Sequence, residues 1–152
     1  MEGFGSRMSR AQVEALVARH TCRISEAVPE GTASVSGSTL LGRYDGHDID
    51  LVVLVPDVAD AAKRLRHFYP TLYEEDWRDD WAAFRHPGPP QVDVVVTKRG
   101  TKGDAHHRRA WELILADDAL RAEYERLKAA GMDSAQKAVF FERIVAMLGD
   151  SA

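Results

Sequence analysis

Hydrophobic residues recur with two different periods along this chain, and the change of period divides it into three parts. Over residues 10–28 apolar side chains recur every three or four positions, which predicts an amphipathic helix. Ser9 stands where an N-cap is needed, and Pro29–Gly31 ends the helix. Short apolar runs typical of strands follow, and the chain is helical again from about residue 104. We therefore predict a mixed sheet between a helical start and a helical end.

The middle of the chain predicts the sheet. The run IDLVVLV at 49–55 is apolar on both faces, so we expect this strand to lie in the centre. A helix should follow from its N-cap Asp57 to about Tyr69, before Pro70. The other strands are expected at 32–36, 72–77, 81–86 and 92–97, with a turn at 78–80 between the second and third of these.

The last third predicts three helices after a polar loop at 98–103. They are expected at about 105–116, 119–130 and 134–148. The expected N-caps are Asp104, Asp117 or Asp118, and Asp133, and the expected stops are Gly131 and Gly149. The pattern indicates an α+β fold with a flexible tail at 1–8 and a single domain over 9–150. That domain would hold a mixed sheet at about 32–97 with flanking helices, and a helical C-terminal segment at about 104–149.

Composition narrows the class of protein. A chain of 152 residues with 45% hydrophobic residues is typical of one globular domain. It has no apolar run long enough to cross a membrane and no apolar signal core, so we expect a cytoplasmic protein with no membrane partner. Its single cysteine, Cys22, excludes a disulfide framework. With 20 basic and 24 acidic residues, the net charge of −4 disfavours general binding of nucleic acid.

Three aspartates stand inside otherwise hydrophobic strands. Asp48 and Asp50 are two positions apart, so their carboxylates should project from one face. Asp93 occupies a similar place in the run VDVVVT. If the two strands are neighbours, the three acids form one cluster whose mutual repulsion a divalent cation would relieve, and oxygen ligands suit Mg²⁺. Three carboxylates can hold two such ions about 3.5–4 Å apart, as in phosphoryl transfer.

A Gly-Ser pair precedes these acids. Gly37 allows the backbone to approach a phosphate closely, and the hydroxyl of Ser38 can donate a hydrogen bond to a phosphate oxygen. Such a pair is weak evidence by itself. Its spacing of nine residues from Asp48, together with the later strand acid Asp93, makes the combination specific.

This combination resembles the signature of the polymerase-β-type nucleotidyltransferase superfamily: a Gly-Ser turn, a spacer of about ten residues, Asp-x-Asp and a later strand acid. The resemblance covers roughly residues 32–145 and is greatest to the minimal nucleotidyltransferases. The C-terminal run from Leu120 to Lys128, with Lys137 and Phe140, is similar to the C-terminal helices of GrpB-like proteins.

The resemblance implies a reaction that moves a nucleoside monophosphate from a nucleoside triphosphate, most simply AMP from ATP, onto a hydroxyl and releases pyrophosphate. Asp48 and Asp50 would bind two Mg²⁺ ions, for which Mn²⁺ can substitute. Asp93 would bind the catalytic ion and help to deprotonate the acceptor, and Ser38 would touch the phosphates. The acceptor would be a small molecule or a protein.

Basic residues near the acids are further candidates. Lys98 and Lys102 follow the Asp93 strand and can reach a phosphate, although a solvated loop explains them equally well. Arg43 and Tyr44 lie in the loop before Asp48 and can either meet the nucleotide or only fill the turn.

Other features leave alternatives open. His106 and His107 are adjacent, so on a helix their side chains diverge and do not form a zinc pair. Neither these two nor His47 receives a role. The acidic run at 74–80 is interpreted as solvated, and the three tryptophans as core or interface. The alternative function is a non-catalytic nucleotide-sensing or protein-binding module, antitoxin-like or GrpB-like, and a homodimer or protein partner stays open.

Overall fold

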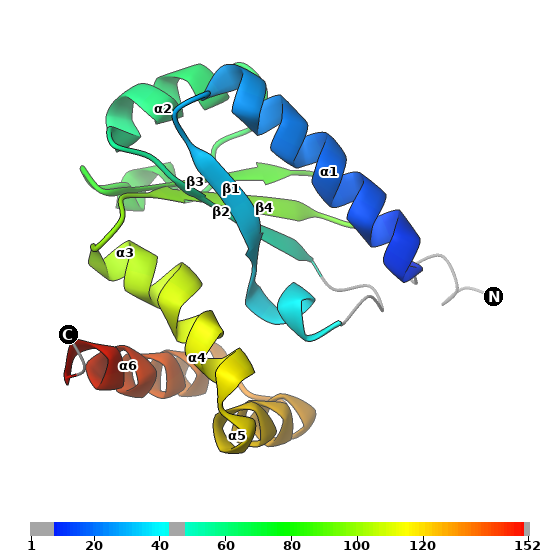
Figure 1. Cartoon of the computed structure of the whole chain (residues 1–152), viewed down its shortest axis with the longest axis vertical. Coiled ribbons are helices and arrows are strands. Elements are labelled where there is room, and N and C mark those ends of the chain that lie inside the picture. Colours follow the sequence, from blue (N-terminus) through cyan, green and yellow to red (C-terminus); the bar gives the residue numbers. More distant parts are fainter. Residues whose placement is uncertain (1–7, 43–47, 151–152) are drawn as a thin grey trace.

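The computed structural model describes residues 8–42 and 48–150, and within these ranges it confirms the α+β class. Four strands form a mixed sheet in the order β1-β2-β4-β3 (Figure 1). The central pair β2 and β4 is parallel, and each outer strand is antiparallel to its neighbour. The strands are β1 (Thr32–Ser36), β2 (Ile49–Leu54), β3 (Trp81–His86) and β4 (Val92–Thr97).

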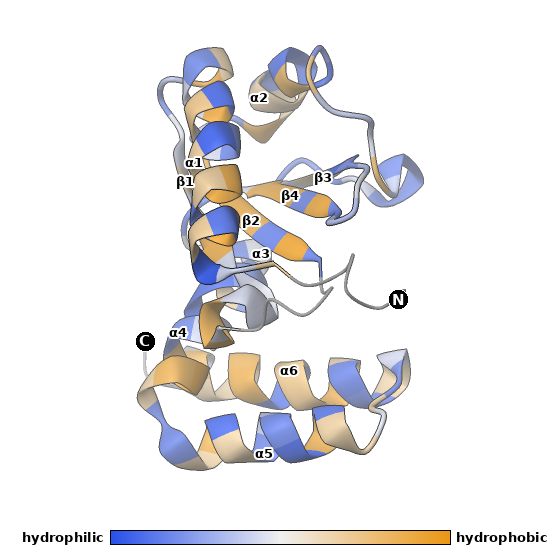
Figure 2. Ribbon diagram, turned by 90° about the vertical axis from the view of Figure 1, so that its right-hand side faces the viewer, coloured by the Kyte–Doolittle hydropathy of each residue, from blue (hydrophilic) through white to orange (hydrophobic). Residues whose placement is uncertain are grey.

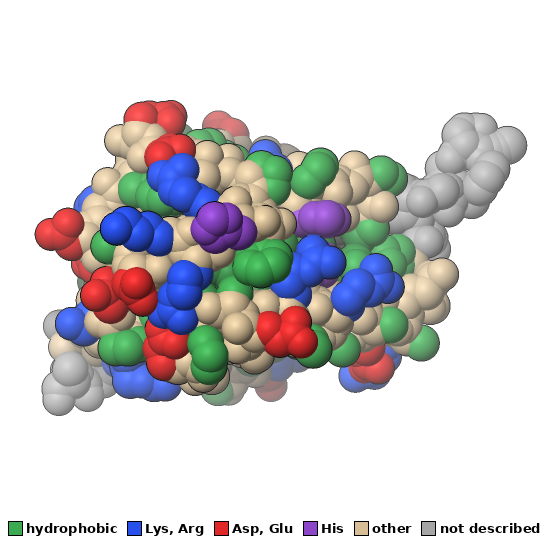
Figure 3. Space-filling view, turned by 90° about the horizontal axis from the view of Figure 1, so that it is seen from above, with side chains coloured by type: hydrophobic (Ala, Val, Ile, Leu, Met, Phe, Trp, Pro, Cys, Tyr) green, Lys and Arg blue, Asp and Glu red, His purple; other side chains and the backbone are tan. Residues whose placement is uncertain are grey.

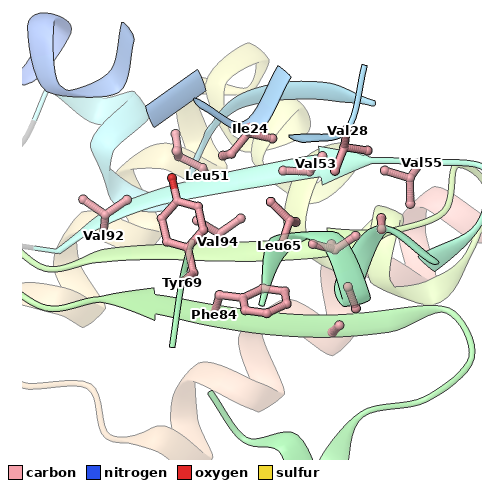
Figure 4. Close-up of a cluster of buried hydrophobic side chains, with 14 of the residues drawn as sticks. Ile24, Val28, Leu51, Val53, Val55, Leu65, Tyr69, Phe84, Val92 and Val94 are labelled. Atoms are coloured by element: carbon pink, nitrogen blue, oxygen red, sulfur yellow. The ribbon is translucent and has the colours of Figure 1, made fainter. Parts of the chain in front are cut away.

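One face of the sheet is buried beneath the first two helices. Side chains alternate between the two faces of a strand, so Leu51 and Val53 of β2 and Val94 of β4 point to this side, where they meet Ile24 and Leu65 (Figure 4). Met8, at the end of the predicted flexible tail, packs against the same core. The alternate positions of β2 and β4 therefore face the other way and are available for a site.

The helices over this face are α1 (Arg10–Ala27) and α2 (Val58–Leu65). Ser9 caps α1 as predicted, through a capping box with Gln12, and Asp57 caps α2. The prediction that α2 runs to about Tyr69 was too long. The chain tightens into a turn after Leu65, because the N–H of Phe68 bonds to the carbonyl of Leu65. This turn buries Tyr69, whose hydroxyl lies 2.7 Å from Nδ1 of His20.

The predicted strand at 72–77 was wrong. Thr71, just before this segment, forms an isolated bridge with Phe84, and the N–H of Leu72 bonds to the carbonyl of Ala83. The chain then forms the short 3₁₀ helix η3 (Glu74–Asp76) instead of a strand. Tyr73 takes a left-handed conformation with φ of 52°, which ends an extended strand. The indole of Trp77 donates to the carbonyl of Leu72 at 2.9 Å and closes the loop.

The C-terminal third is helical, with different boundaries from those predicted. Thr101, rather than Asp104, is the first N-cap, and Asp104 is fully buried beneath Arg108. Gly149 lies inside the last helix, so the prediction that it stops the helix was wrong. The elements are α3 (Lys102–Asp104), the π-helical turn η4 (Ala105–Arg109), α4 (Ala110–Ala116), α5 (Asp118–Ala129) and α6 (Ser134–Asp150).

These helices form a second core on the opposite side of the sheet from α1 and α2 (Figures 1 and 2). Trp111, Tyr124 and Phe141 are its large buried side chains. The 3₁₀ helix η2 (Gly37–Leu41), which follows β1, packs Leu40 and Leu41 against this core. This 3₁₀ helix therefore links the sheet to the helical segment.

The face of the molecule over α1 and α2 has no single dominant charge (Figure 3). On the side of α1 and α2, basic and acidic side chains are interspersed (Figure 3). Within the described ranges, none of the helices is both long enough and apolar enough for a membrane span.

Candidate functional site

Two of the predicted acids lie directly opposite each other in the centre of the sheet. Asp50 of β2 and Asp93 of β4 are register partners in the parallel pair, so their side chains share the face away from α1 and α2. Asp48 comes just before β2. All three line one cleft of about 390 Å³ between the sheet and the C-terminal helices.

The carboxyl of Asp50 titrates unusually. Burial, together with the negative charges of Asp93 and Asp48, raises its pKa to about 7, although Lys137 and Lys128 oppose the change. No described residue donates a hydrogen bond to this carboxylate. At neutral pH the site thus has an acid whose charge is poorly compensated by the described part of the chain.

The other two acids are held by side chains. Nε of Arg85 donates to Oδ1 of Asp93 at 2.7 Å, and Nη2 of Arg85 donates to Oδ2 at 3.0 Å. Asp48 accepts from the side-chain amide of Gln91 at 2.6 Å. The three carboxylates are therefore not equivalent: among the described residues, Asp93 has a full counter-charge, Asp48 has a neutral partner and Asp50 has neither.

The Gly-Ser turn lies against Asp50. Gly37 has φ of 66°, and a Cβ added to it would lie 2.3 Å from Oδ2 of Asp50. Ser38 is the next residue, is nearly buried and lines the cleft. The hydroxyl of Thr39 donates to the carbonyl of Asp48, at 3.4 Å. Only glycine fits at position 37, because any side chain would occupy the space of the Asp50 carboxylate.

The cleft takes its positive charge from residues that we did not single out as candidates. Lys128 of α5 and Lys137 of α6 line it, and both act on the charge of Asp50. The sequence contained one signal, since both lysines belong to the run that resembles GrpB-like C-terminal helices. Their spacing alone does not indicate that α5 and α6 fold back toward β2 and β4.

The predicted phosphate-binding lysines do not line this cleft. Lys98 is at the far end of β4, where it borders a different hollow with Arg99 and Glu30. Lys102 begins α3 and is exposed, although its charge reaches His106. Arg43, with Tyr44 and His47, lies outside the described residues.

The π-helical turn brings His106 and His107 into the same cleft. Burial, together with the charges of His106, Lys137 and Arg78, lowers the pKa of His107 to about 4. Nε2 of His107 accepts a hydrogen bond from the indole of Trp81 at 3.2 Å, so the neutral ring carries its proton on Nδ1. Its backbone carbonyl accepts from the hydroxyl of Ser36, which ties η4 to the end of β1.

Aromatic rings form the wall of the cleft nearest the helices. Trp111, Tyr124 and Phe141 line it, with centroids of neighbouring rings 5.1–5.4 Å apart. Trp81 contributes from β3, and Tyr73, with 54% of its surface exposed, lies at the rim. The cleft thus has an acidic floor, an aromatic wall and two lysines, an arrangement suited to a phosphorylated, ring-containing ligand.

The cleft has the charge to attract a divalent cation, but its described residues do not form a ready set of metal ligands. No group of three His, Cys, Asp or Glu residues in the described parts of the chain is gathered closely enough to hold a metal ion. The donors are nonetheless hard oxygens, and the like charges of Asp93 and Asp48 beside Asp50 would be relieved by a cation. Asp48 and Asp50 could take a cation while the pair of Arg85 and Asp93 stays in place, whereas Arg85 opposes a cation on Asp93.

Comparisons with known proteins give a distant likeness. No family model matches the chain, and no curated protein matches it in sequence. Among solved structures it is similar to a cytoplasmic RNA terminal U-transferase, with a TM-score of 0.46 and 15% sequence identity. The match covers 62% of this chain and 31% of that one, so this chain corresponds to about a third of that protein. At this distance the likeness does not identify a substrate, and the chemistry rests on the residues of the cleft.

Proposed function

We propose that the protein is a Mg²⁺-dependent nucleotidyltransferase that moves a nucleoside monophosphate, AMP from ATP, onto a hydroxyl of a small molecule or a protein. One observation carries this proposal: Asp50 and Asp93 are register partners on the open face of the sheet, with Gly37 packed against Asp50. This places the Gly-Ser turn and the strand acids of the sequence signature in one cleft.

The residues of the cleft would have separate roles in binding the metal, the phosphates and the base. Asp48 and Asp50 would hold the metal, with Asp93 joining them once Arg85 releases it. Bound Mg²⁺ (or Mn²⁺) would offset the charge of the triphosphate. Ser38 would donate to a phosphate oxygen. Lys128 and Lys137 would attract the phosphates from the opposite side of the cleft, and the aromatic wall would hold the base.

In the proposed transfer, the acceptor hydroxyl oxygen forms a bond to the α-phosphorus, and the bond from that phosphorus to the oxygen bridging to the β-phosphate breaks. Pyrophosphate leaves with that electron pair. The hydroxyl proton passes to Asp93 or, through it, to solvent. Catalysis by this cleft would come chiefly from positioning and charge.

Calorimetric titration with ATP, GTP, CTP and UTP, each with Mg²⁺ and with EDTA, tests the proposal. We expect one nucleotide to bind with Mg²⁺ only, and the Asp48→Asn/Asp50→Asn variant to lose that binding. Lys137→Ala should weaken it about tenfold or more, the size of a lost charged contact. Lys98→Ala is the matched control, since Lys98 does not line the cleft. Failure of every nucleotide to bind to folded protein would refute the proposal.

Turnover supplies the second test. Once a nucleotide is identified, pyrophosphate release is measured in the presence of pools of candidate acceptors. Asp93→Asn should abolish release while leaving the thermal unfolding transition cooperative. Release at the wild-type rate by folded Asp93→Asn protein would remove Asp93 from the catalytic group.

One observation favours the second candidate function, a non-catalytic nucleotide-sensing or protein-binding module. Arg85 occupies both oxygens of Asp93, which is the arrangement expected where that acid has become structural. A module of this kind would keep its ligand or partner after Asp93→Asn, whereas a transferase would lose turnover.

A further inference from the structure

Arg85 holds Asp93 in a way that conflicts with the use of Asp93 as a metal ligand. The two residues are register partners on the antiparallel strands β3 and β4, so the backbone brings their side chains together on the same face. The contact is bidentate, at 2.7 Å and 3.0 Å. The Asp93 side chain is only 18% exposed and that of Arg85 is 35% exposed, so water screens the pair incompletely.

In this pairing both carboxylate oxygens of Asp93 accept hydrogen bonds from Arg85. A planar guanidinium that grips both oxygens of a carboxylate is among the strongest side-chain contacts available. A divalent cation near Asp50 needs oxygen ligands and is repelled by the guanidinium charge. Arg85 therefore opposes metal binding through Asp93, both by its charge and by holding the two oxygens.

Arg85 also offsets the negative charge of the cleft when no metal is bound. Asp50 and Asp93 are opposite each other, and Asp48 adds a third carboxylate. Without a nearby cation, these charges would repel one another in a partly buried site. Arg85 supplies that cation from the chain itself.

We propose that Arg85 is a positioning residue that competes with the divalent cation for Asp93. The nucleotide-free protein then binds metal weakly, and the site takes its metal together with a nucleoside triphosphate. A phosphate can accept the same fork of N–H donors that the carboxylate gives up. This inference deepens the proposed nucleotidyltransferase function and rests on it.

The test measures Mn²⁺ binding to nucleotide-free protein by electron paramagnetic resonance, which reports free Mn²⁺ without any turnover. We expect Arg85→Gln to bind Mn²⁺ about tenfold or more tightly than wild type, because a charged competitor is removed. Arg85→Lys should fall between the two, since an ammonium keeps the charge but cannot grip both oxygens side by side. Arg78→Gln is the control, because Arg78 is an exposed arginine paired with Asp80 rather than with a cleft acid.

A second titration repeats the experiment with wild type in the presence of a non-hydrolysable ATP analogue. We expect the analogue to increase Mn²⁺ affinity strongly in wild type and much less in Arg85→Gln, whose site is already open. Thermal unfolding checks that each variant is folded, and Arg85→Lys serves if Arg85→Gln is not.

The outcomes separate the two proposals. If the folded Arg85 variants bind free Mn²⁺ no more tightly than wild type, while wild type binds Mn²⁺ with the analogue, the role of Arg85 is wrong and the proposed function stands. Tight binding of free Mn²⁺ by wild type also overturns the role of Arg85. If wild type binds neither Mn²⁺ nor the analogue, the proposed function itself fails.

Discussion

Replacing Asp50 by Asn should stabilise the metal-free protein at neutral and alkaline pH. The pKa of Asp50 is raised in the folded state to about 7, chiefly by burial and then by Asp93 and Asp48. The folded protein therefore holds a proton on Asp50 that the unfolded chain releases near its ordinary pKa of 3.8. Stability contributed by this group is full below that value and is lost as the pH rises toward 7.

The size of the effect follows from the shift in pKa. From 3.8 to about 7 is about three units, and each unit corresponds to about 1.4 kcal/mol, so the ionised Asp50 costs at most about 4 kcal/mol above pH 7. At pH 5 the same calculation gives less than about 2 kcal/mol. The advantage of Asp50→Asn should thus grow by up to about 3 kcal/mol between pH 5 and pH 8.

Urea unfolding with EDTA at several pH values between 5 and 8 measures this difference. Asp79→Asn is the matched control, because Asp79 is exposed and the variant should stay within about 0.5 kcal/mol of wild type. Mg²⁺ with nucleotide should then stabilise wild type and not Asp50→Asn. An Asp50→Asn protein that is less stable than wild type at pH 8, with no dependence on pH, would show that the charge of Asp50 is already compensated.

Three other changes test separate parts of the fold and the site. Burial holds the pKa of His20 at about 4, so the unfolded chain binds more protons than the folded chain between pH 4 and 6.5. Wild type should therefore lose stability when the pH falls from 7.5 to 5.0, and His20→Asn should lose about 2 kcal/mol less in urea unfolding. Equal losses in the two proteins would contradict this. Gly37→Ala should cost about 1–2 kcal/mol for its positive φ and displace the Asp50 carboxylate, so calorimetry should show loss of nucleotide binding; retained binding would mean that the turn can move. Thr101→Ala should cost about 1 kcal/mol in thermal or urea unfolding, because Thr101 caps α3, and no change would show that its bond to the N–H of Asp104 is dispensable.

The parts of the fold that local pattern determines were predictable. The strands at 32–36, 81–86 and 92–97 have the predicted bounds, because period and turn residues agree there. The segment at 72–77 has apolar residues at its ends and acids at 74–76, and it does not form a strand. Thr71 and the N–H of Leu72 still bond to β3, but the left-handed Tyr73 then turns the chain away. Apolar residues beside a turn fit a sheet, and the loop geometry decides whether a strand forms.

The candidate site was predictable where it depends on the sheet and unpredictable where it depends on the helices. The prediction that Asp50 and Asp93 lie together required only that their strands be neighbours, and the observed register places the two residues side by side. Lys98 is close to Asp93 in sequence, but a strand rises about 3.3 Å per residue, so five residues carry it roughly 16 Å away. Lys137 is distant in sequence and enters the cleft because α6 packs back through Phe141.

Asp50 owes its raised pKa to the contact between the two cores, because neither core would produce that shift alone. The sheet supplies the carboxylate and its neighbour Asp93, while the helical core supplies the wall that removes water from it. That wall is held to the sheet by the packing of Leu40 of η2 into the helical core and by the hydrogen bonds of Ser36 and Trp81 to His107. An acid kept partly charged in such a place is costly for stability, and a cation brought with a substrate offsets that cost only when the substrate is present. Binding at this cleft should therefore tighten the contact between the sheet and the C-terminal helices.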